Sequence, residues 1–446
     1  MFSVSYRLRR GELPLVDKAF KESAADSDFS KYVILGNGPA GISALLAIRE
    51  IDPDGGVVIV SPEVERYYSK ILLTYWIGAR IRFDDIFLVD EDFYEKNGVR
   101  CLFGAGATRV DTVQREVELR DGWRLRYDSL LLAMGGSPQV PDIPGVDLPG
   151  VHYLRTIEDG KKLRKATSTS KRAVVIGGGL VSIKTVEALL ALNIQVLLVV
   201  SSGRLLSQIT SPLDSQMTRA MFQAPGLDIR LNCDVETIEG DGQVDKVRLS
   251  TGDVIGCDMV VVGKGVSPNL SCIEGTEVKT GTGIIVNDRM ETGAPHVYAA
   301  GDVAECYDIT RGKPWVNALW SSAVWQGRIA GYNMAGRRVS YAGDVGLNSI
   351  TFGDKCLITL GKTRPDKGDE VSFFRDESRE EYRRLIFTGG RLVGAVISGP
   401  SAQASGVLRS LMARNEDTAA IRDALLGARL TYGDVMQAGT RLSHCG

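Results

Sequence analysis

The sequence predicts an α/β protein with two parallel-sheet units and a smaller α+β unit at its carboxyl end. Two segments that read strand, glycine loop, helix, strand carry this prediction, one in residues 31–60 and one in residues 173–200. Each segment is expected to form two parallel strands joined by a helix, and their wide separation places them in different domains. The third observation is a change beyond residue 340, where short apolar stretches are typical of antiparallel strands.

Apolar stretches and their flanking glycines set the expected elements. Those of the two parallel units are Lys31–Leu35, Pro39–Glu50, Val57–Val60, Ala173–Ile176, Leu180–Leu192 and Gln195–Val200. The expected C-terminal strands are Ser349–Phe352, Val371–Phe374, Arg384–Phe387 and Leu392–Ile397, followed by a helix over Gln403–Arg414. Gly389 and Gly390 separate the last two strands, which is typical of a hairpin.

Composition and charge exclude several classes of protein. The 446 residues are 44% hydrophobic and carry a formal net charge of −2, which gives no indication of a nucleic-acid partner or an anionic membrane. No apolar stretch is long enough to span a bilayer. The first residues are charged throughout and lack the apolar core of a signal peptide, so we expect a cytoplasmic protein.

The cysteines and histidines argue against a metal centre. The seven cysteines are an odd number and no two form a CxxC pair, and the three histidines are few and dispersed. We therefore expect scattered buried thiols and no metal ligands.

Two charged segments each leave two interpretations open. Residues 1–30 form either a disordered arm, which we favour slightly, or an arm that packs on a partner. The basic run over residues 161–172 is either a solvated helix face or a docking patch.

The first glycine loop, residues 36–41 (GNGPAG), follows a strand and opens a helix. Its first glycine permits a tight turn, its second lets a pyrophosphate approach the backbone, and its third lets helix and strand pack closely. The phosphates would lie on free N–H groups at the helix N-terminus. Ser61 stands at the strand end where a ribose carboxylate is expected, and Glu63 is the nearest candidate.

The second loop, residues 177–182 (GGGLVS), has the same placement, with Ser182 in place of the third glycine. Val200 stands at the end of the next strand, where NAD-selective folds place an acid. Arg204 follows and could meet a 2′-phosphate. The choice between NAD and NADP is therefore open.

A third motif, residues 298–303 (YAAGDV), runs an apolar strand into Gly301 and Asp302. In a flavin site such an aspartate accepts a hydrogen bond from a ribityl hydroxyl, although the motif alone could be an ordinary turn. Downstream, Pro314–Gly331 has small residues at helical spacing, among them Ala318, which suit close approach to a flat ring.

Together with residues 130–136 (LLLAMGG), residues 258–263 (DMVVVG) and Pro268-Asn269, these motifs resemble the pyridine nucleotide-disulfide oxidoreductase superfamily over roughly residues 31–340. The resemblance implies FAD and NAD or NADP as cofactors and two Rossmann-like domains, with the NAD(P)-binding domain inserted in a split FAD-binding domain. The implied divisions are an N-terminal extension at 1–30, FAD binding at 31–150 and 280–340, NAD(P) binding at 151–279, and a C-terminal α+β domain at 341–446.

The sequence departs from the family pattern at its thiols and at one glutamate. The CxxxxC of the disulfide members is missing, and Lys70 occupies the place of the single reactive cysteine found in related oxidases and peroxidases. The YSK at 68–70 resembles rubredoxin reductases and the flavin portion of assimilatory nitrite reductases. Lys184 stands where disulfide members have a glutamate facing the flavin.

The resemblance places Lys70 near flavin N5 as the catalytic residue. The ordinary alternative is a surface lysine on a helix. Because Lys184 holds the usual place of the counter-carboxylate, the resemblance leaves the flavin itself as the partner of Lys70, and two lysines in one site would repel.

Without thiols, reduced flavin must pass electrons directly to an acceptor, which implies an iron–sulfur protein or partner subunit. The FAD subunits of phenylglyoxylate dehydrogenase-type complexes are similar in kind, so a hetero-complex or a homo-oligomer is expected. Two alternatives stay open: a self-contained NAD(P)H oxidase, and a flavin-binding scaffold or sensor resembling apoptosis-inducing factor.

The resemblance and the motifs together give one catalytic candidate, Lys70, and a set of cofactor-binding candidates. That set is Gly36, Gly38, Pro39, Ala40, Gly41, Glu63, Lys70, Ala133, Gly135, Gly301, Asp302, Ala318, Gly177, Gly179, Leu180, Val181, Val200 and Gly263.

Overall fold

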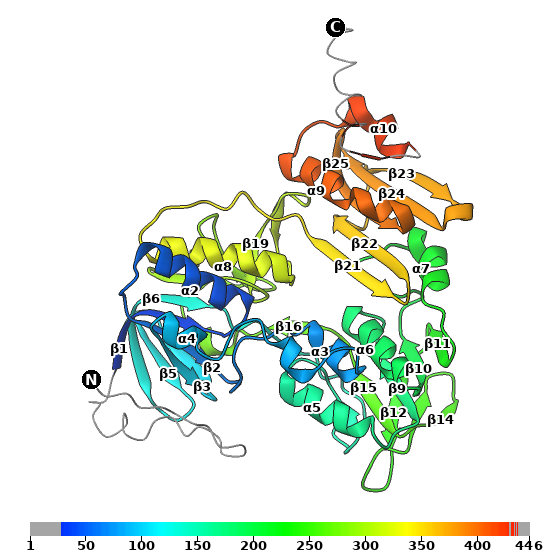
Figure 1. The fold of residues 1–446 in the computed structure, drawn as a ribbon, viewed down its shortest axis with the longest axis horizontal. Coiled ribbons are helices and arrows are strands. Elements are labelled where there is room, and N and C mark those ends of the chain that lie inside the picture. The colour runs from blue at the N-terminus through cyan, green and yellow to red at the C-terminus, as the bar shows by residue number, and fades with distance from the viewer. Residues whose placement is uncertain (1–27, 428–429, 432, 434, 436–446) are drawn as a thin grey trace.

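The computed structural model describes residues 28–427, 430, 431, 433 and 435, and its elements form three groups (Figure 1). One group surrounds helices α2 (Pro39–Ile51) and α8 (Trp320–Met334), a second surrounds α6 (Leu180–Ala191), and the third is a C-terminal sheet. No helix in the described part of the chain is long and apolar enough to cross a bilayer. Of the predicted extension at 1–30, residues 1–27 lie outside the described residues.

The first group is built on a seven-stranded sheet in the order β3-β2-β1-β6-β5-β4, with β18 beside β6. Its strands are β1 (Asp28–Leu35), β2 (Val57–Ser61), β3 (Val99–Phe103), β4 (Ala107–Asp111), β5 (Glu116–Leu119), β6 (Arg124–Leu132) and β18 (Val297–Ala299). Strands β2, β1, β6 and β18 are parallel neighbours. The sheet therefore unites an early and a late segment of the chain, and the first predicted strand–helix–strand unit is confirmed, with its first strand beginning at Asp28.

The second group is a five-stranded parallel sheet in the order β11-β10-β9-β15-β8, accompanied by a three-stranded sheet. Its elements are β8 (Val151–His152), α5 (Ile157–Ala166), β9 (Arg172–Ile176), β10 (Gln195–Val200), α7 (Ser215–Met221), β11 (Leu227–Leu231), β12 (Val235–Glu239), β13 (Lys246–Leu249), β14 (Val254–Gly256) and β15 (Met259–Val262). Alternate residues of β9 face opposite sides: Val175 packs with the core that contains α6, and Val174 packs with the small sheet. This confirms the second predicted unit.

Two short strands tie the first two groups together where the chain crosses between them. Strand β7 (Gly136–Pro138) leaves the first sheet, and β16 (Val266–Pro268) returns from the second, and the two pair antiparallel. Asn269 adds a backbone bond to the carbonyl of Gly135 at 2.9 Å and a side-chain bond to the carbonyl of Met134 at 3.0 Å. The Pro-Asn pair noted in the sequence thus fixes this double crossover.

The C-terminal group is an antiparallel sheet in the order β21-β22-β25-β24-β23 with two helices. Its elements are β21 (Leu347–Phe352), β22 (Lys355–Gly361), β23 (Glu370–Asp376), β24 (Glu381–Thr388), β25 (Arg391–Ser398), α9 (Ser405–Arg414) and α10 (Arg422–Leu426). The four predicted strands and the hairpin at Gly389-Gly390 are confirmed. Strand β22 was missed because Leu357–Gly361 is buried throughout and lacks the polar alternation of a half-exposed strand.

A buried ion pair fastens the C-terminal sheet to the second group. Arg384 donates two hydrogen bonds to Asp214, each 2.7 Å long, and both side chains are fully buried. The hydroxyl of Tyr382 donates to the same carboxylate at 2.8 Å. Because removing one member would leave a buried charge unpaired, this contact fixes how the two groups dock.

The remaining elements are short. They are α3 (Leu72–Ile77), α4 (Phe93–Lys96), β17 (Ile284–Ile285), β19 (Ala304–Asp308) and β20 (Lys313–Trp315), with 3-10 turns at Phe83–Ile86, Pro212–Asp214, Ser271–Ile273, Glu377–Arg379, Gly399–Ala404 and Ala419–Ile421. Strand β20 pairs with β19. The helical spacing expected over Pro314–Gly331 is therefore wrong at its start, because Pro314 lies in a strand and α8 begins at Trp320.

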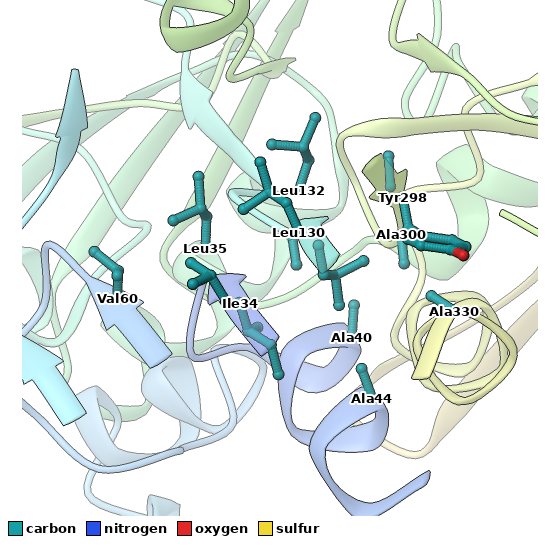
Figure 2. Packing of buried hydrophobic residues seen from close by; sticks show 14 of the residues in the cluster. Ile34, Leu35, Ala40, Ala44, Val60, Leu130, Leu132, Tyr298, Ala300 and Ala330 are labelled. Atoms are coloured by element: carbon teal, nitrogen blue, oxygen red, sulfur yellow. The ribbon is translucent and has the colours of Figure 1, made fainter. Parts of the chain in front are cut away.

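The small residues of α8 serve a helix–helix contact. A Cβ on Gly327 would lie 2.1 Å from the carbonyl oxygen of Ala40, and one on Gly331 would lie 2.4 Å from that of Ala44. Figure 2 shows Ala40 and Ala44 of α2 close to Ala330 of α8. Glycine is needed here because the two backbones approach more closely than any side chain allows. This contact holds the first glycine loop, at the start of α2, against the late segment of the chain.

We predict that Gly327→Ala destabilises the protein by about 1–3 kcal/mol, because its new methyl group would overlap the α2 backbone. Chemical denaturation followed by circular dichroism measures the change. Gly406→Ala is the matched control, since Gly406 in α9 has nothing within 4 Å of its Cβ direction. Equal stability of the two variants would show that α2 and α8 can separate freely.

Candidate functional site

The first glycine loop is shaped by two backbone contacts. Gly36 has φ +125°, and a Cβ there would lie 2.1 Å from the carbonyl oxygen of Ala133. A Cβ on Gly41 would lie 2.1 Å from the carbonyl oxygen of Gly36. The turn therefore needs its first glycine, and the packing of α2 on the strand end needs its third.

The second loop repeats this geometry with one change. Gly177 has φ +104°, and a Cβ there would lie 2.4 Å from the carbonyl oxygen of Gly263. Ser182, at the third glycine position, donates its hydroxyl hydrogen to the same carbonyl at 3.3 Å. The serine thus keeps the close packing of helix and strand and adds a bond across it.

The middle glycine of each loop faces open space. Neither Gly38 nor Gly179 has any atom within 4 Å of its Cβ direction. Helices α2 and α6 begin directly after them with no side-chain cap and no acidic residue in the first turn. Free N–H groups and the positive end of a helix dipole therefore border two open spaces, which fits two pyrophosphates.

The loop after β10 packs on the second glycine loop. Leu206 N donates to the carbonyl of Gly178 at 2.7 Å, and Val200 is buried. Two arginines, Arg204 and Arg364 of the C-terminal group, both donate to the carbonyl of Ser207. Burial, and then the nearby Arg364, lowers the pKa of Arg204. Two arginines therefore lie at this end of the site. The choice between NAD and NADP stays open, as the sequence left it.

Lys70 has a carboxylate partner that sequence reasoning missed. Its Nζ lies 2.7 Å from Oε1 of Glu63, 3.0 Å from the hydroxyl of Tyr68 and 3.3 Å from the carbonyl oxygen of Arg155. The Tyr68 hydroxyl donates to the other oxygen of Glu63. Glu63 was expected on a ribose, and the structure instead places its carboxylate on Lys70 and Tyr68. Its contact with a ribose stays a prediction.

The environment of this cluster shifts two of its groups. Burial lowers the pKa of Lys70 below the usual 10.5, although Glu63 opposes the change. Burial, and then the Glu63 carboxylate, raises the pKa of Tyr68. Tyr68 therefore stays protonated as a hydrogen-bond donor, and Lys70 is a lysine whose proton is held less tightly than usual.

Asp302 is joined to this cluster through Arg155. Nη2 of Arg155 lies 2.9 Å from Oδ2 of Asp302, and its carbonyl accepts from Lys70. A Cβ on Gly135 would lie 3.3 Å from the same guanidinium. Arg155 lies between β8 and α5, in the segment that enters the second group. No sequence motif marks Arg155, because its two partners, Lys70 and Asp302, are both distant from it in the sequence.

The structure divides the predicted site residues into two sets. The first, on the first sheet and its connections, contains Gly36, Gly38, Pro39, Ala40, Gly41, Glu63, Lys70, Ala133, Gly135, Gly301, Asp302 and Ala318. The second, around α6 and the ends of β10 and β15, contains Gly177, Gly179, Leu180, Val181, Val200 and Gly263. The roles of these residues stay predictions.

Lys184 does not share the Lys70 cluster. Its Nζ contacts the carboxylate of Glu187, lies 3.2 Å from the carbonyl oxygen of Thr351, and stands 4.8 Å from the ring centroid of Tyr75. Each lysine therefore has its own carboxylate, which removes the repulsion expected between them.

The six cysteines in the described part of the chain are free thiols. Burial raises the pKa of Cys101, Cys257 and Cys306 to about 12. These thiols stay protonated near neutral pH, and a protonated thiol is a poor nucleophile. Cys101 lies in β3, in the strand region where the sequence placed it.

Comparison with known proteins confirms the resemblance. A family model described as pyridine nucleotide-disulphide oxidoreductase matches residues 30–327. The chain is 32% identical to the epsilon subunit of NADH-dependent phenylglyoxylate dehydrogenase from Aromatoleum evansii, over 93% of this chain and 98% of that subunit. It is 28% identical to the NADH-rubredoxin oxidoreductase of Clostridium acetobutylicum, over 89% of this chain and 98% of that enzyme.

Other matches are partial or concern the fold alone. The chain spans about half the length of two Bacillus subtilis relatives, covering 50% of an assimilatory nitrate reductase electron transfer subunit and 46% of a nitrite reductase [NAD(P)H]. A solved complex of putidaredoxin reductase with putidaredoxin gives a TM-score of 0.85 at 21% identity, over 92% of this chain and 99% of that one. This likeness shows a shared fold.

We predict that valine at the two middle glycines separates the two nucleotide sites. Gly38→Val directs a side chain into the first open space, so the folded variant should be colourless, without FAD. Gly179→Val should keep its FAD and its reduction by dithionite and lose reduction by NADH. Absorbance spectra and anaerobic titration measure both effects. Full flavin content in Gly38→Val, or normal NADH reduction in Gly179→Val, would contradict the assignment of that loop.

Proposed function

Because the chain belongs to the pyridine nucleotide-disulphide oxidoreductase family, we propose that it connects a nicotinamide coenzyme to an iron–sulfur protein or partner subunit. It is an FAD-dependent NAD(P)H oxidoreductase, and no disulfide is present among the residues that the structure describes. The observation that carries the proposal is the pairing of Lys70 with Glu63, at a position that the family resemblance assigns to the reactive sulfur of thiol-dependent members.

The two glycine loops divide the cofactors between them. We assign FAD to residues 31–150 and 280–340, where the first loop, Asp302 and Lys70 converge, and NAD(P) to residues 151–279, around the second loop. The open space beside Gly38 and the one beside Gly179 support the binding of one dinucleotide at each loop. The paired strands β7 and β16 connect the two groups that carry these loops, which supports cooperation between the two proposed sites.

The chemistry asked of the chain is a conversion between paired and single electrons. Bound FAD would accept the hydride of NAD(P)H and release its electrons singly, so that one NADH reduces two one-electron centres and leaves one proton. Among the described cysteines, those most buried hold their protons and offer no thiolate for a relay. The reaction can run in either direction.

Lys70 is the residue to which we give the catalytic role, facing flavin N5. Its ammonium group favours negative charge that develops beside it, and a partly desolvated site strengthens that effect. Glu63 and Tyr68 hold the ammonium in place. Arg155 aligns Asp302, which we assign to the ribityl hydroxyls.

The relatives support the kind of partner. One near full-length relative is a subunit of a phenylglyoxylate dehydrogenase, and another is named for its action on rubredoxin, an iron protein. A partner that carries the one-electron centre fits a chain whose described residues contain no group of three or more metal-ligating side chains. A self-contained NAD(P)H oxidase and a flavin scaffold are the alternatives.

Acceptor specificity tests this function. The FAD-loaded protein is mixed with NADH under argon, and its reoxidation is followed with rubredoxin, with a ferredoxin, and with oxygen in separate experiments. We predict that an iron–sulfur or iron acceptor reoxidises the flavin much faster than oxygen does. Fast oxygen turnover would identify an oxidase, and slow reoxidation by every acceptor would identify a scaffold; either result would overturn the proposal.

We predict that Lys70→Met keeps FAD, lowers the flavin potential and slows flavin reduction by NADH about tenfold, equal to ~1.4 kcal/mol of barrier. Stopped-flow absorbance and redox titration measure the two effects. Lys96→Met, which removes an exposed lysine paired with Asp92, is the matched control.

The lowered pKa of Lys70 adds a pH signature to this prediction. As pH rises through that lowered pKa, the Lys70 cation is lost. In the wild type the rate of flavin reduction should therefore decrease with rising pH, and the decrease should begin before pH 10.5 is reached. The decrease should be missing in Lys70→Met. An unchanged potential and an unchanged pH profile in the variant would make Lys70 a structural lysine.

A further inference from the structure

Glu187 is a buried carboxylate on α6, the helix that opens with the second glycine loop. Its side chain is only 7% exposed. Oε1 accepts hydrogen bonds from Nη1 of Arg80 at 2.9 Å and from the backbone N–H of Gly353 at 3.3 Å. No sequence motif marks this residue, and it lies outside both glycine loops.

The partners of Glu187 come from three segments that are distant in the sequence. Arg80 follows α3, which packs against α5 and α6, and Gly353 is in the turn between β21 and β22 of the C-terminal sheet. Lys184, one helical turn earlier on α6, binds the other oxygen of Glu187 and reaches the carbonyl of Thr351 at 3.2 Å. One carboxylate is therefore the meeting point of three parts of the chain.

Helix α3 links the Glu187 junction to the segment that carries Lys70. The helix begins two residues after Lys70 and packs against α6. A Cβ on Gly78, at its end, would lie 3.1 Å from Cα of Ala188, the residue next to Glu187. Lys70 and the second glycine loop thus stand at the starts of two helices that touch, and Arg80 and Glu187 bind each other where those helices meet.

The charges at this junction make the carboxylate necessary. Burial alone would raise the pKa of Glu187, but hydrogen bonds from Lys184 and Arg80 outweigh it and leave the pKa below its usual value. Without the negative charge, the largely buried Lys184 and the partly exposed Arg80 would lose the carboxylate that they share. The contact between Arg80 and α6 would then weaken, because two like charges near each other repel and Arg80 has water available to it.

We propose that Glu187 is a positioning residue for hydride transfer. Its carboxylate holds α6, and with it the nicotinamide site, in register with the segment that carries Lys70. The inference rests on the proposed assignment of the two nucleotide sites. It does not depend on which acceptor takes the electrons.

A purely structural role is the competing explanation, since a buried ion pair can stabilise a fold without affecting chemistry. The two explanations differ in what they leave unchanged. A structural residue changes the unfolding temperature alone. A positioning residue changes the rate of hydride transfer while flavin content, flavin potential and coenzyme affinity stay the same, because a small misplacement of reacting atoms is costly.

Glu187→Gln in the FAD-loaded protein is the test, with NADH as the reductant. We expect flavin reduction to slow about tenfold to a hundredfold. The dissociation constant of NAD+, the flavin spectrum and the rate of reduction by dithionite should match the wild type. A normal rate of reduction by NADH, whether or not the unfolding temperature falls, would overturn the proposal.

Two further variants make the test specific. Glu50→Gln removes a carboxylate that binds Arg328 and Tyr332 between α2 and α8, inside the first group, and should leave hydride transfer unchanged. Arg80→Met should slow hydride transfer, and adding Glu187→Gln should slow it little further, because both variants break one contact. Fully additive effects, or an equal loss in Glu50→Gln, would contradict the proposal. If Glu187→Gln does not fold, Arg80→Met alone decides, and a normal rate there overturns the proposal.

Discussion

The structure depends on the contact between each glycine loop and the carbonyl oxygen opposite it. Gly36 lies against Ala133 at the end of β6, and Gly177 lies against Gly263 at the end of β15. Both strand ends lead into the crossover between the two sheets. The same close approach that opens a space for a pyrophosphate therefore also fixes where the chain leaves one unit for the other, so binding and domain geometry share one constraint.

Paired charges supply the second level of organisation. Lys70 is paired with Glu63, Arg155 with Asp302, and Lys184 with Glu187. Each of these three cations has a nearby carboxylate, which offsets the cost of removing it from water. Glu63 and Lys70 are only seven residues apart, and the Arg155 carbonyl of the second group adds a further contact to the same ammonium group.

Local patterns were sufficient to predict the two strand–loop–helix units, the hairpin at Gly389-Gly390 and the family. Strand β22 was not predicted because it is buried along most of its length. Helix α8 begins later than predicted because Pro314 belongs to β20, which pairs with β19. The partners of Lys70 could not be predicted either. Glu63 and Arg155 reach it through a loop and a domain crossover, and contacts of that kind depend on tertiary packing that sequence spacing does not encode.

If electrons pass through this protein without a thiol, a variant with all seven cysteines replaced by alanine or serine should still transfer them. The FAD-loaded variant would be reduced with NADH under argon and then mixed with a one-electron iron acceptor, with flavin absorbance followed in both steps. We predict that both rates stay close to those of the wild type. Retention of flavin with loss of either step would contradict this prediction.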